Sequence, residues 1–175
     1  MNLLQALATI LLLPGMSAAG ISSARAEIAE GRDYTVLSHP QPADEKSIEV
    51  IEFFWYGCPH CYELHPRIKA WLKRMPNDVS FRYVPAVFRA NWIPGAKTFY
   101  ALEALGVRDK LHDNVYDAIH RDKIDLTKDE VLFDWIAKQG VDRQKFIDAY
   151  NSFAVQNQVT RTTRMSKDYG LSGVP

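Results

Sequence analysis

The sequence predicts an α/β fold with a block of helices inserted into a sheet-containing domain. An apolar, β-rich run over residues 47–55 predicts a buried strand. Residues 91–167 are instead charged and helix-forming, with no proline after Pro94. Strand-forming sequence on both sides of this block indicates an α/β core with a helical insertion.

Composition limits the class of protein. The chain has 175 residues, 47% of them hydrophobic, and its 21 basic and 21 acidic side chains cancel. This length suits one globular domain, and the hydrophobic content excludes a disordered chain. Zero net charge argues against a nucleic-acid-binding protein, which needs a basic face. Two cysteines cannot form the framework of a disulfide-rich miniprotein.

The N-terminal segment resembles a targeting sequence. The apolar run Leu3–Leu13 has about half the length that a membrane-spanning helix needs. Ala24-Arg25-Ala26 matches the small residues that precede a signal-peptidase cut, so we expect residues 1–26 to be a signal peptide. A cut after Ala19 and a retained membrane anchor are the alternatives. Export would bring the chain into an oxidising compartment, where a cysteine pair persists as a disulfide.

Turn residues and hydrophobic spacing predict the remaining elements. Residues 27–46 are polar and predict an arm with one short strand near 34–37. Thr127 and Glu130 match a capping box, and Gly140 predicts the end of the helix that follows. Further helices are expected over 97–105, 110–120, 143–153 and 154–168.

Cys58 and Cys61 stand at the predicted start of a helix, directly after the buried strand. Pro59 suits a first helical turn because its missing N–H has no partner there. The helix dipole and the unpaired N–H groups stabilise a thiolate at Cys58, and a protonated His60 would add a second positive charge. Cys61 lies one turn further along. The spacing therefore predicts one exposed nucleophile and one sheltered partner.

Three other uses of the cysteine pair are weaker. A structural zinc site needs four ligands, and the sequence has neither a second cysteine pair nor paired histidines at zinc-site spacing. Covalent haem attachment needs histidine after the second cysteine, where Tyr62 stands. A purely structural disulfide across two residues would close a very small loop and constrain little chain entropy. Redox activity is the favoured interpretation. His39 and His65 are interpreted as ordinary surface or packing residues.

The segment Ile51–Tyr62, with Cys-Pro-His-Cys as its specific part, resembles the active-site segment of the DsbA family in the thioredoxin superfamily. Thioredoxins usually carry Gly-Pro between their cysteines. The resemblance extends from about Tyr34 to Pro175. It implies a thioredoxin-like fold interrupted by a helical domain, with its first part over 27–90, the insertion over 91–165 and the start of the second part over 166–175.

The resemblance also implies an activity. Cys58 would be the attacking nucleophile and Cys61 the resolving cysteine of a redox-active disulfide, with no other cofactor and no metal. The implied protein is a periplasmic monomer that oxidises unfolded or reduced exported proteins and is recharged by a membrane reoxidase of the DsbB type. A reductase or isomerase with the same motif is one alternative. A non-enzymatic module that binds a peptide or a metal is the other.

Three further residues follow from the resemblance. Glu52 shares a strand face with Val50 and Phe54, so burial should raise its pKa and suit it to accept the proton of Cys61. Val174 and Pro175 match the family's cis-proline dipeptide, which packs against the disulfide and presents backbone groups to the substrate. The family continues beyond this proline with two strands and a helix. We therefore expect the chain to be a fragment whose sheet lacks that edge.

Overall fold

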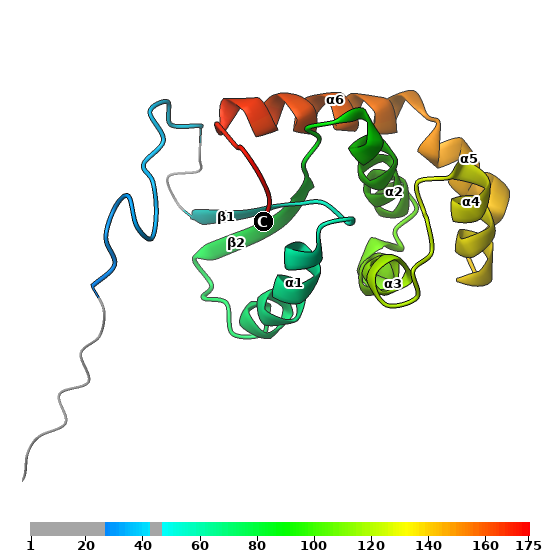
Figure 1. Cartoon of the computed structure of the whole chain (residues 1–175), viewed down its shortest axis with the longest axis horizontal. Helices are drawn as coiled ribbons and strands as arrows, with labels where there is room; N and C mark the ends of the chain where they lie inside the picture. The colour runs from blue at the N-terminus through cyan, green and yellow to red at the C-terminus, as the bar shows by residue number, and fades with distance from the viewer. Residues whose placement is uncertain (1–26, 43–46) are drawn as a thin grey trace, which may run out of the picture. The chain divides into compact units, whose positions relative to one another are not determined.

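A computed structural model describes residues 27–42 and 47–175 (Figure 1). The predicted signal peptide lies outside these residues. The chain divides into one unit that ends at Val36 and a second over Leu37–Pro175. The predicted strand at 34–37 is wrong, because Tyr34 forms only an isolated bridge to Glu30. A local turn uses these backbone groups instead: the Tyr34 carbonyl accepts a hydrogen bond from the N–H of Gly31, which has a φ of 79°.

The sheet of the second unit is a parallel pair within the described residues. Strands β1 (Ile48–Phe54) and β2 (Val79–Pro85) pair in register from Ile48 opposite Val79 to Phe54 opposite Pro85. Helix α1 (Pro59–Leu72) connects them, as a parallel pair requires. Figure 1 shows α1 on one side of the sheet and α6 (Phe153–Asp168) on the other. The strand predicted within residues 47–55 is confirmed, one residue shorter at each end.

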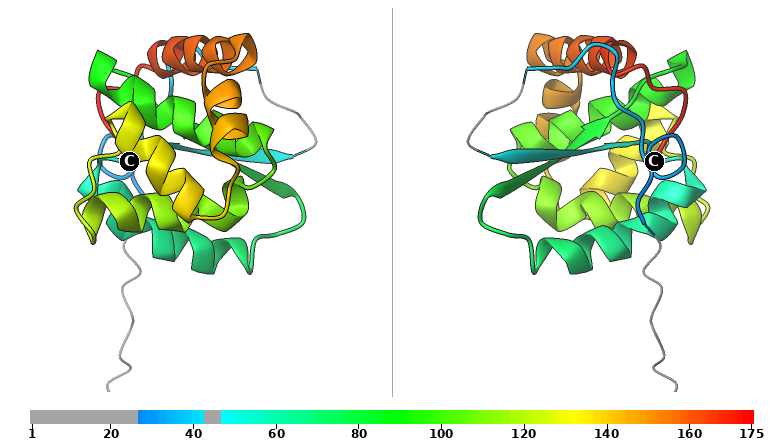
Figure 2. Two further views of the ribbon diagram at one scale, coloured as in Figure 1. Left: turned by 90° about the vertical axis from the view of Figure 1, so that its right-hand side faces the viewer. Right: turned by 90° about the vertical axis from the view of Figure 1, so that its left-hand side faces the viewer.

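The remaining helices gather on the side of the carboxyl ends of both strands (Figures 1 and 2). They are the short 3-10 turn η1 (Ala90–Trp92), α2 (Ile93–Ala104), α3 (Arg108–His120), α4 (Asp129–Lys138) and α5 (Arg143–Tyr150). Helix α2 begins at Ile93 rather than Lys97, because Pro94 is accepted in its first turn. Gly140, with a φ of 80°, follows the end of α4 as predicted.

The predicted capping box is wrong. The N-cap of α4 is Lys128, which offers no side-chain cap. The Thr127 hydroxyl instead donates to Asp125 Oδ1 at 2.5 Å, so it stabilises the preceding turn. Side-chain caps are found instead at the starts of the next two helices, α5 and α6. Asp142 accepts from the N–H of Lys145 at the start of α5, and a serine does the same for α6.

An aromatic core ties the carboxyl end of β1 to the helices. Phe54 is 0% exposed, and its ring centroid lies 5.1 to 6.1 Å from those of five neighbouring rings, Tyr56, Tyr83, Phe99, His112 and Tyr116. On the opposite face of the sheet, Phe53 packs with Tyr169 after α6. This alternation was predicted from the strand. No helix in the described part of the chain is long and apolar enough to cross a membrane.

Candidate active site

The two cysteines lie at the start of α1, immediately beyond the carboxyl end of β1. Residues 55–57 make the turn, and the N–H of Cys58 donates to the carbonyl of Trp55 at 2.9 Å. Cys58 is the N-cap with extended backbone, and the helix begins at Pro59. This confirms the helix start that the sequence predicted. Both thiols are free, so the structure presents the dithiol form.

The two thiols differ in access. Cys61 is 0% exposed, as expected for the sheltered partner, but Cys58 is only 7% exposed and therefore more covered than predicted. Residues from neighbouring segments shield the Cys58 thiol from solvent. Cys58 lies in a groove of about 300 Å³ lined by Trp55, Pro59, Phe88, Arg89, Trp92 and residues 172–174. A reacting sulfur must enter through this groove.

Cys61 resists ionisation in this setting. Burial is the main cause that raises the pKa of its thiol to about 12; a backbone hydrogen bond involving Trp55 opposes the rise, and the neighbouring Cys58 and Glu52 add to it. Reduced Cys61 therefore holds its proton at neutral pH. When Cys61 loses or takes up this proton during exchange, a neighbouring group must accept or donate it.

Glu52 is a candidate for that carrier. It is 7% exposed on β1, and neither carboxylate oxygen has a hydrogen-bond partner. Burial raises its pKa from 4.5 to about 7, in agreement with the sequence-based expectation. A carboxyl with this pKa can donate or accept a proton near neutral pH. Its part in exchange remains a prediction.

His60 is exposed on the first turn of α1. Its Nδ1 lies 3.6 Å from Oε2 of Glu63, one turn along the same helix. The sequence reasoning did not identify Glu63. This carboxylate stands beside the cation that was expected to stabilise the Cys58 thiolate, and so weakens the positive field at the sulfur.

The far end of the chain meets the first cysteine. The Val174–Pro175 peptide bond is cis, as the resemblance implied. The thiol of Cys58 donates to the carbonyl of Val174 across 3.5 Å, within the range of a weak sulfur hydrogen bond. Residues 116 positions apart in the sequence thus form one side of the groove.

An aromatic wall forms another side of the groove, and sequence reasoning did not predict it. The indoles of Trp55 and Trp92 stack with centroids 4.3 Å apart and planes 3° apart. Gly57 makes room for this arrangement, because a Cβ there would lie 2.3 Å from the Trp55 ring. The only sequence signal was a tryptophan two residues before a glycine in the active-site turn.

Helix α3 holds the turn from behind. Nδ1 of His112 is hydrogen-bonded to the Tyr56 hydroxyl at 2.7 Å, and Nε2 of His120 donates to the Tyr56 carbonyl at 2.7 Å. Burial lowers the pKa of His112 to about 3, so its ring is neutral. With Tyr116 these histidines recur every four residues, so they share one helix face. Helical spacing was the signal that could have found them.

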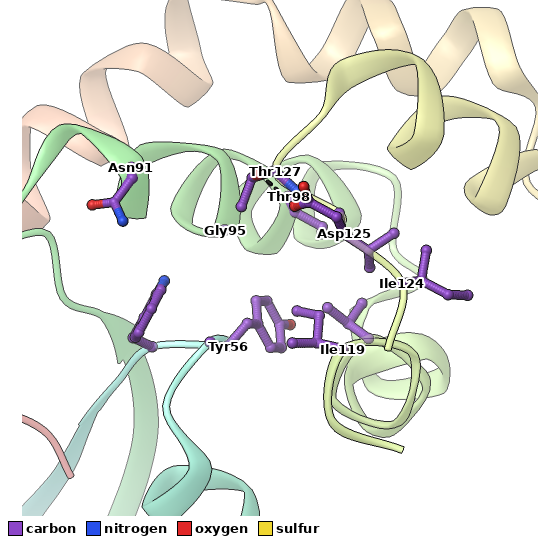
Figure 3. A pocket seen from close by; sticks show the side chains of 12 residues that line it. Tyr56, Asn91, Gly95, Thr98, Ile119, Ile124, Asp125 and Thr127 are labelled. Atoms are coloured by element: carbon purple, nitrogen blue, oxygen red, sulfur yellow. Dashed lines mark hydrogen bonds between the residues drawn. The ribbon is translucent and has the colours of Figure 1, made fainter. Parts of the chain in front are cut away.

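A second pocket lies behind the turn, separate from the Cys58 groove. It has a volume of about 110 Å³, and Figure 3 shows Tyr56 and Ile119 next to each other on one side of it, with Gly95 and Thr98 of α2 on the opposite side. Within residues 27–42 and 47–175, no group of three or more His, Cys, Asp or Glu side chains could hold a metal ion.

Similarity to known proteins identifies the family of this chain. A family model described as a DSBA-like thioredoxin domain matches residues 90–175. The thiol:disulfide interchange protein DsbA of Burkholderia cepacia is 46% identical over 171 residues, which cover 97% of this chain and 81% of that protein. The chain belongs to the DsbA family. It is accordingly a disulfide-forming thiol:disulfide oxidoreductase with a DsbA-like thioredoxin fold.

Further relatives agree. The DsbA of Azotobacter vinelandii is 44% identical over 151 residues, covering 86% of this chain and 71% of that protein. A crystal structure of a Pseudomonas aeruginosa DsbA variant superimposes with a TM-score of 0.81 at 39% identity, covering 85% of this chain and 81% of that one. NmDsbA1 from Neisseria meningitidis gives a TM-score of 0.75 at 30% identity, covering 86% of this chain and 80% of that one.

Proposed function

We propose that the Cys58–Cys61 disulfide is the oxidant that this chain donates to cysteine pairs of unfolded or reduced proteins. The observation that carries the proposal is the unequal placement of the two sulfurs at the start of α1. Cys58 opens into a groove, whereas Cys61 is fully buried behind it. Only Cys58 is therefore placed to meet a second protein.

Exchange proceeds in two displacements. A substrate thiolate attacks Sγ of Cys58, the Cys58–Cys61 bond breaks, and Cys61 leaves as a thiolate that takes up a proton. The second substrate thiolate then attacks the substrate sulfur of the mixed disulfide and releases Cys58 as a thiolate. Two electrons pass from the substrate to the cysteine pair, and the substrate leaves with a disulfide.

The surrounding residues have separate tasks in this proposal. Glu52 supplies the proton for Cys61, since its pKa of about 7 lets the carboxyl give up a proton near neutral pH. The N-terminus of α1, with Pro59 in its first turn and His60 beside it, stabilises the Cys58 thiolate as a leaving group. Stabilisation of the reduced form makes the disulfide a stronger oxidant.

The groove accepts an extended peptide. In this proposal, backbone groups of Val174 and Pro175 pair with the peptide main chain; the contact between the Val174 carbonyl and the Cys58 thiol supports it, because it puts that backbone beside the cysteine. Phe88 and Trp92 supply apolar contact area for the side chains that flank it. An extended peptide is the conformation that an unfolded substrate offers most readily.

The biological setting belongs to the same proposal. The chain is exported to the periplasm by the signal peptide at 1–26, acts there as a monomer, and is reoxidised by a membrane partner of the DsbB type. It needs no cofactor beyond its disulfide. Support comes from the curated relatives, which are named thiol:disulfide interchange protein DsbA.

The test is exchange with a reduced two-cysteine peptide. The oxidised chain should form the peptide disulfide with one-to-one stoichiometry, and Cys58→Ser should form none. Equilibration with glutathione shows whether the chain acts as an oxidant or as a reductant. An equilibrium that favours the oxidised chain would identify a reductase, and peptide binding without exchange would identify a binding module; either result overturns the proposal.

A further inference from the structure

Buried polar atoms without hydrogen-bond partners are concentrated around Cys61. Among the described residues, every such side-chain nitrogen or oxygen belongs to one of four residues, Glu52, His65, His112 and Tyr116. They come from β1, α1 and α3, and Glu52 contributes both carboxylate oxygens. Native proteins pair nearly all buried polar groups, so a cluster of exceptions requires a reason.

The rings of the cluster pack against one another, although the polar atoms make no hydrogen bond to each other. The hydroxyl of Tyr116 is buried, and besides burial the negative charges of Cys61 and Glu52 raise its pKa. The Tyr116 ring lies 5.2 Å from the ring of His65, and His112 lies 4.9 Å from His65 on another side. The buried carboxyl, the buried hydroxyl and the imidazole are thus polar groups of one region in an otherwise apolar core, and proton transfer between them needs a bridging water.

His65 is oriented to carry a proton at the end of this path. Its Nε2 lies 2.7 Å from Oδ1 of Asp113. Because an ionised carboxylate only accepts hydrogen bonds, this contact assigns the hydrogen of the neutral ring to Nε2, and Nδ1 of that tautomer carries the lone pair. Nδ1 is the buried atom of His65 without a partner. The ring can therefore take a proton on its inner nitrogen and release one from its outer nitrogen.

The outer nitrogen of His65 is linked to solvent through Asp113. Asp113 also pairs with Lys69, and its side chain is 42% exposed. A pocket of about 510 Å³ between α1 and α3 is lined by His65, Lys69, Asp113 and Tyr116, among others. The charged and titratable groups that face the imidazole are therefore Lys69 on its own helix, Asp113, His112 and Tyr116 on α3, and Tyr83 on β2.

We propose that His65, held by Asp113, is a relay residue that passes protons between the α1/α3 pocket and the Glu52–Cys61 pair. The inference rests on the proposed exchange reaction and adds its proton route. When Cys61 leaves as a thiolate, Glu52 gives it a proton, and the Glu52 carboxylate regains one from solvent through His65 and Tyr116. Reoxidation runs the same path outward. No electrons move along it, since they pass only between sulfur atoms.

The test is single-turnover oxidation of a dithiol peptide by the oxidised full-length chain. His65→Gln keeps an amide donor for Asp113 but cannot carry a proton. Because general acid–base groups typically contribute 10²–10⁴-fold to a rate, we expect His65→Gln to be at least tenfold slower. Its equilibrium constant with glutathione should stay within twofold of the original. Added imidazole should restore the rate in proportion to its concentration, and the exposed His39→Gln should react at the original rate.

Each other outcome overturns the relay. An unchanged rate for His65→Gln while Glu52→Gln is slow leaves the proposed function intact and removes His65 from the route. A slow variant that does not respond to imidazole has lost only packing. If His65→Gln does not fold, Asp113→Asn decides: slowing supports the relay and the original rate overturns it. Failure of the unsubstituted chain to oxidise the peptide would instead overturn the proposed function.

Discussion

Replacing Glu52 by glutamine should stabilise the fold at alkaline pH and leave it nearly unchanged at acidic pH. The carboxyl is buried without a hydrogen-bond partner, and its pKa rises from 4.5 to about 7 on folding. A tenfold change in an equilibrium is worth about 1.4 kcal/mol, so full ionisation of Glu52 costs the folded state about 3 kcal/mol. Glutamine has a similar shape and removes this cost.

The sign of the pH dependence follows from the raised pKa. Below pH 4.5 the carboxyl is protonated in both states, so it contributes no pH dependence. Between about pH 4.5 and 7 the unfolded chain loses the proton while the folded chain keeps it, and stability falls. Above pH 7 both states are ionised and the loss is complete. The variant should lack this fall.

Urea denaturation of the reduced chain from pH 4 to pH 8.5 measures the effect. The difference in free energy of unfolding between Glu52→Gln and the original chain should grow from near zero to about 3 kcal/mol. Glu30→Gln, at an exposed position, is the matched control and should follow the original chain throughout. Parallel curves for Glu52→Gln and the original chain would refute the assignment of a buried carboxyl with a raised pKa.

Three other substitutions test the site and its support. His60→Ala should make the chain a weaker oxidant in glutathione equilibration, because the Cys58 thiolate loses a neighbouring cation, and each 30 mV corresponds to about 1.4 kcal/mol; an unchanged or more oxidising potential contradicts this. Phe54→Ala should lower the free energy of unfolding by about 3–5 kcal/mol in urea titration, since the ring is fully buried, and a loss below about 1 kcal/mol would be incompatible with that packing. Gly57→Ala should displace the Trp55 indole from its stack and change the near-ultraviolet circular dichroism; an identical spectrum would mean that the turn tolerates a Cβ.

Local sequence signals predicted the elements that local interactions determine. The β-rich run gave β1 to within one residue at each end, and Pro59 gave the start of α1, because both depend on neighbouring residues alone. Gly140 was equally clear, since a left-handed residue after a helix favours glycine. The predicted capping box was wrong because the Thr127 hydroxyl bonds to Asp125 instead. This contact stabilises the turn before α4 and leaves the helix start without a side-chain cap.

Contacts between distant segments could not be predicted in the same way. His65 was interpreted as a surface or packing histidine, and its burial depends on Asp113, which is 48 residues away. The meeting of Cys58 with Val174 came from family resemblance alone, because no local pattern links the two. The stacked tryptophans depend on η1 folding back over the turn. Tertiary packing decides each of these, and residue spacing within one element carries no information about it.

The hydrogen bond from His120 to the Tyr56 carbonyl gives the helices a mechanical role. Helix α3 can neither slide nor tilt against the active-site turn without breaking this bond and the one between His112 and the Tyr56 hydroxyl. These two hydrogen bonds therefore hold the active-site turn rigidly against α3. Conformational adjustment on binding must then come from the substrate. A flexible, unfolded substrate therefore fits the Cys58 groove better than a compact, folded one.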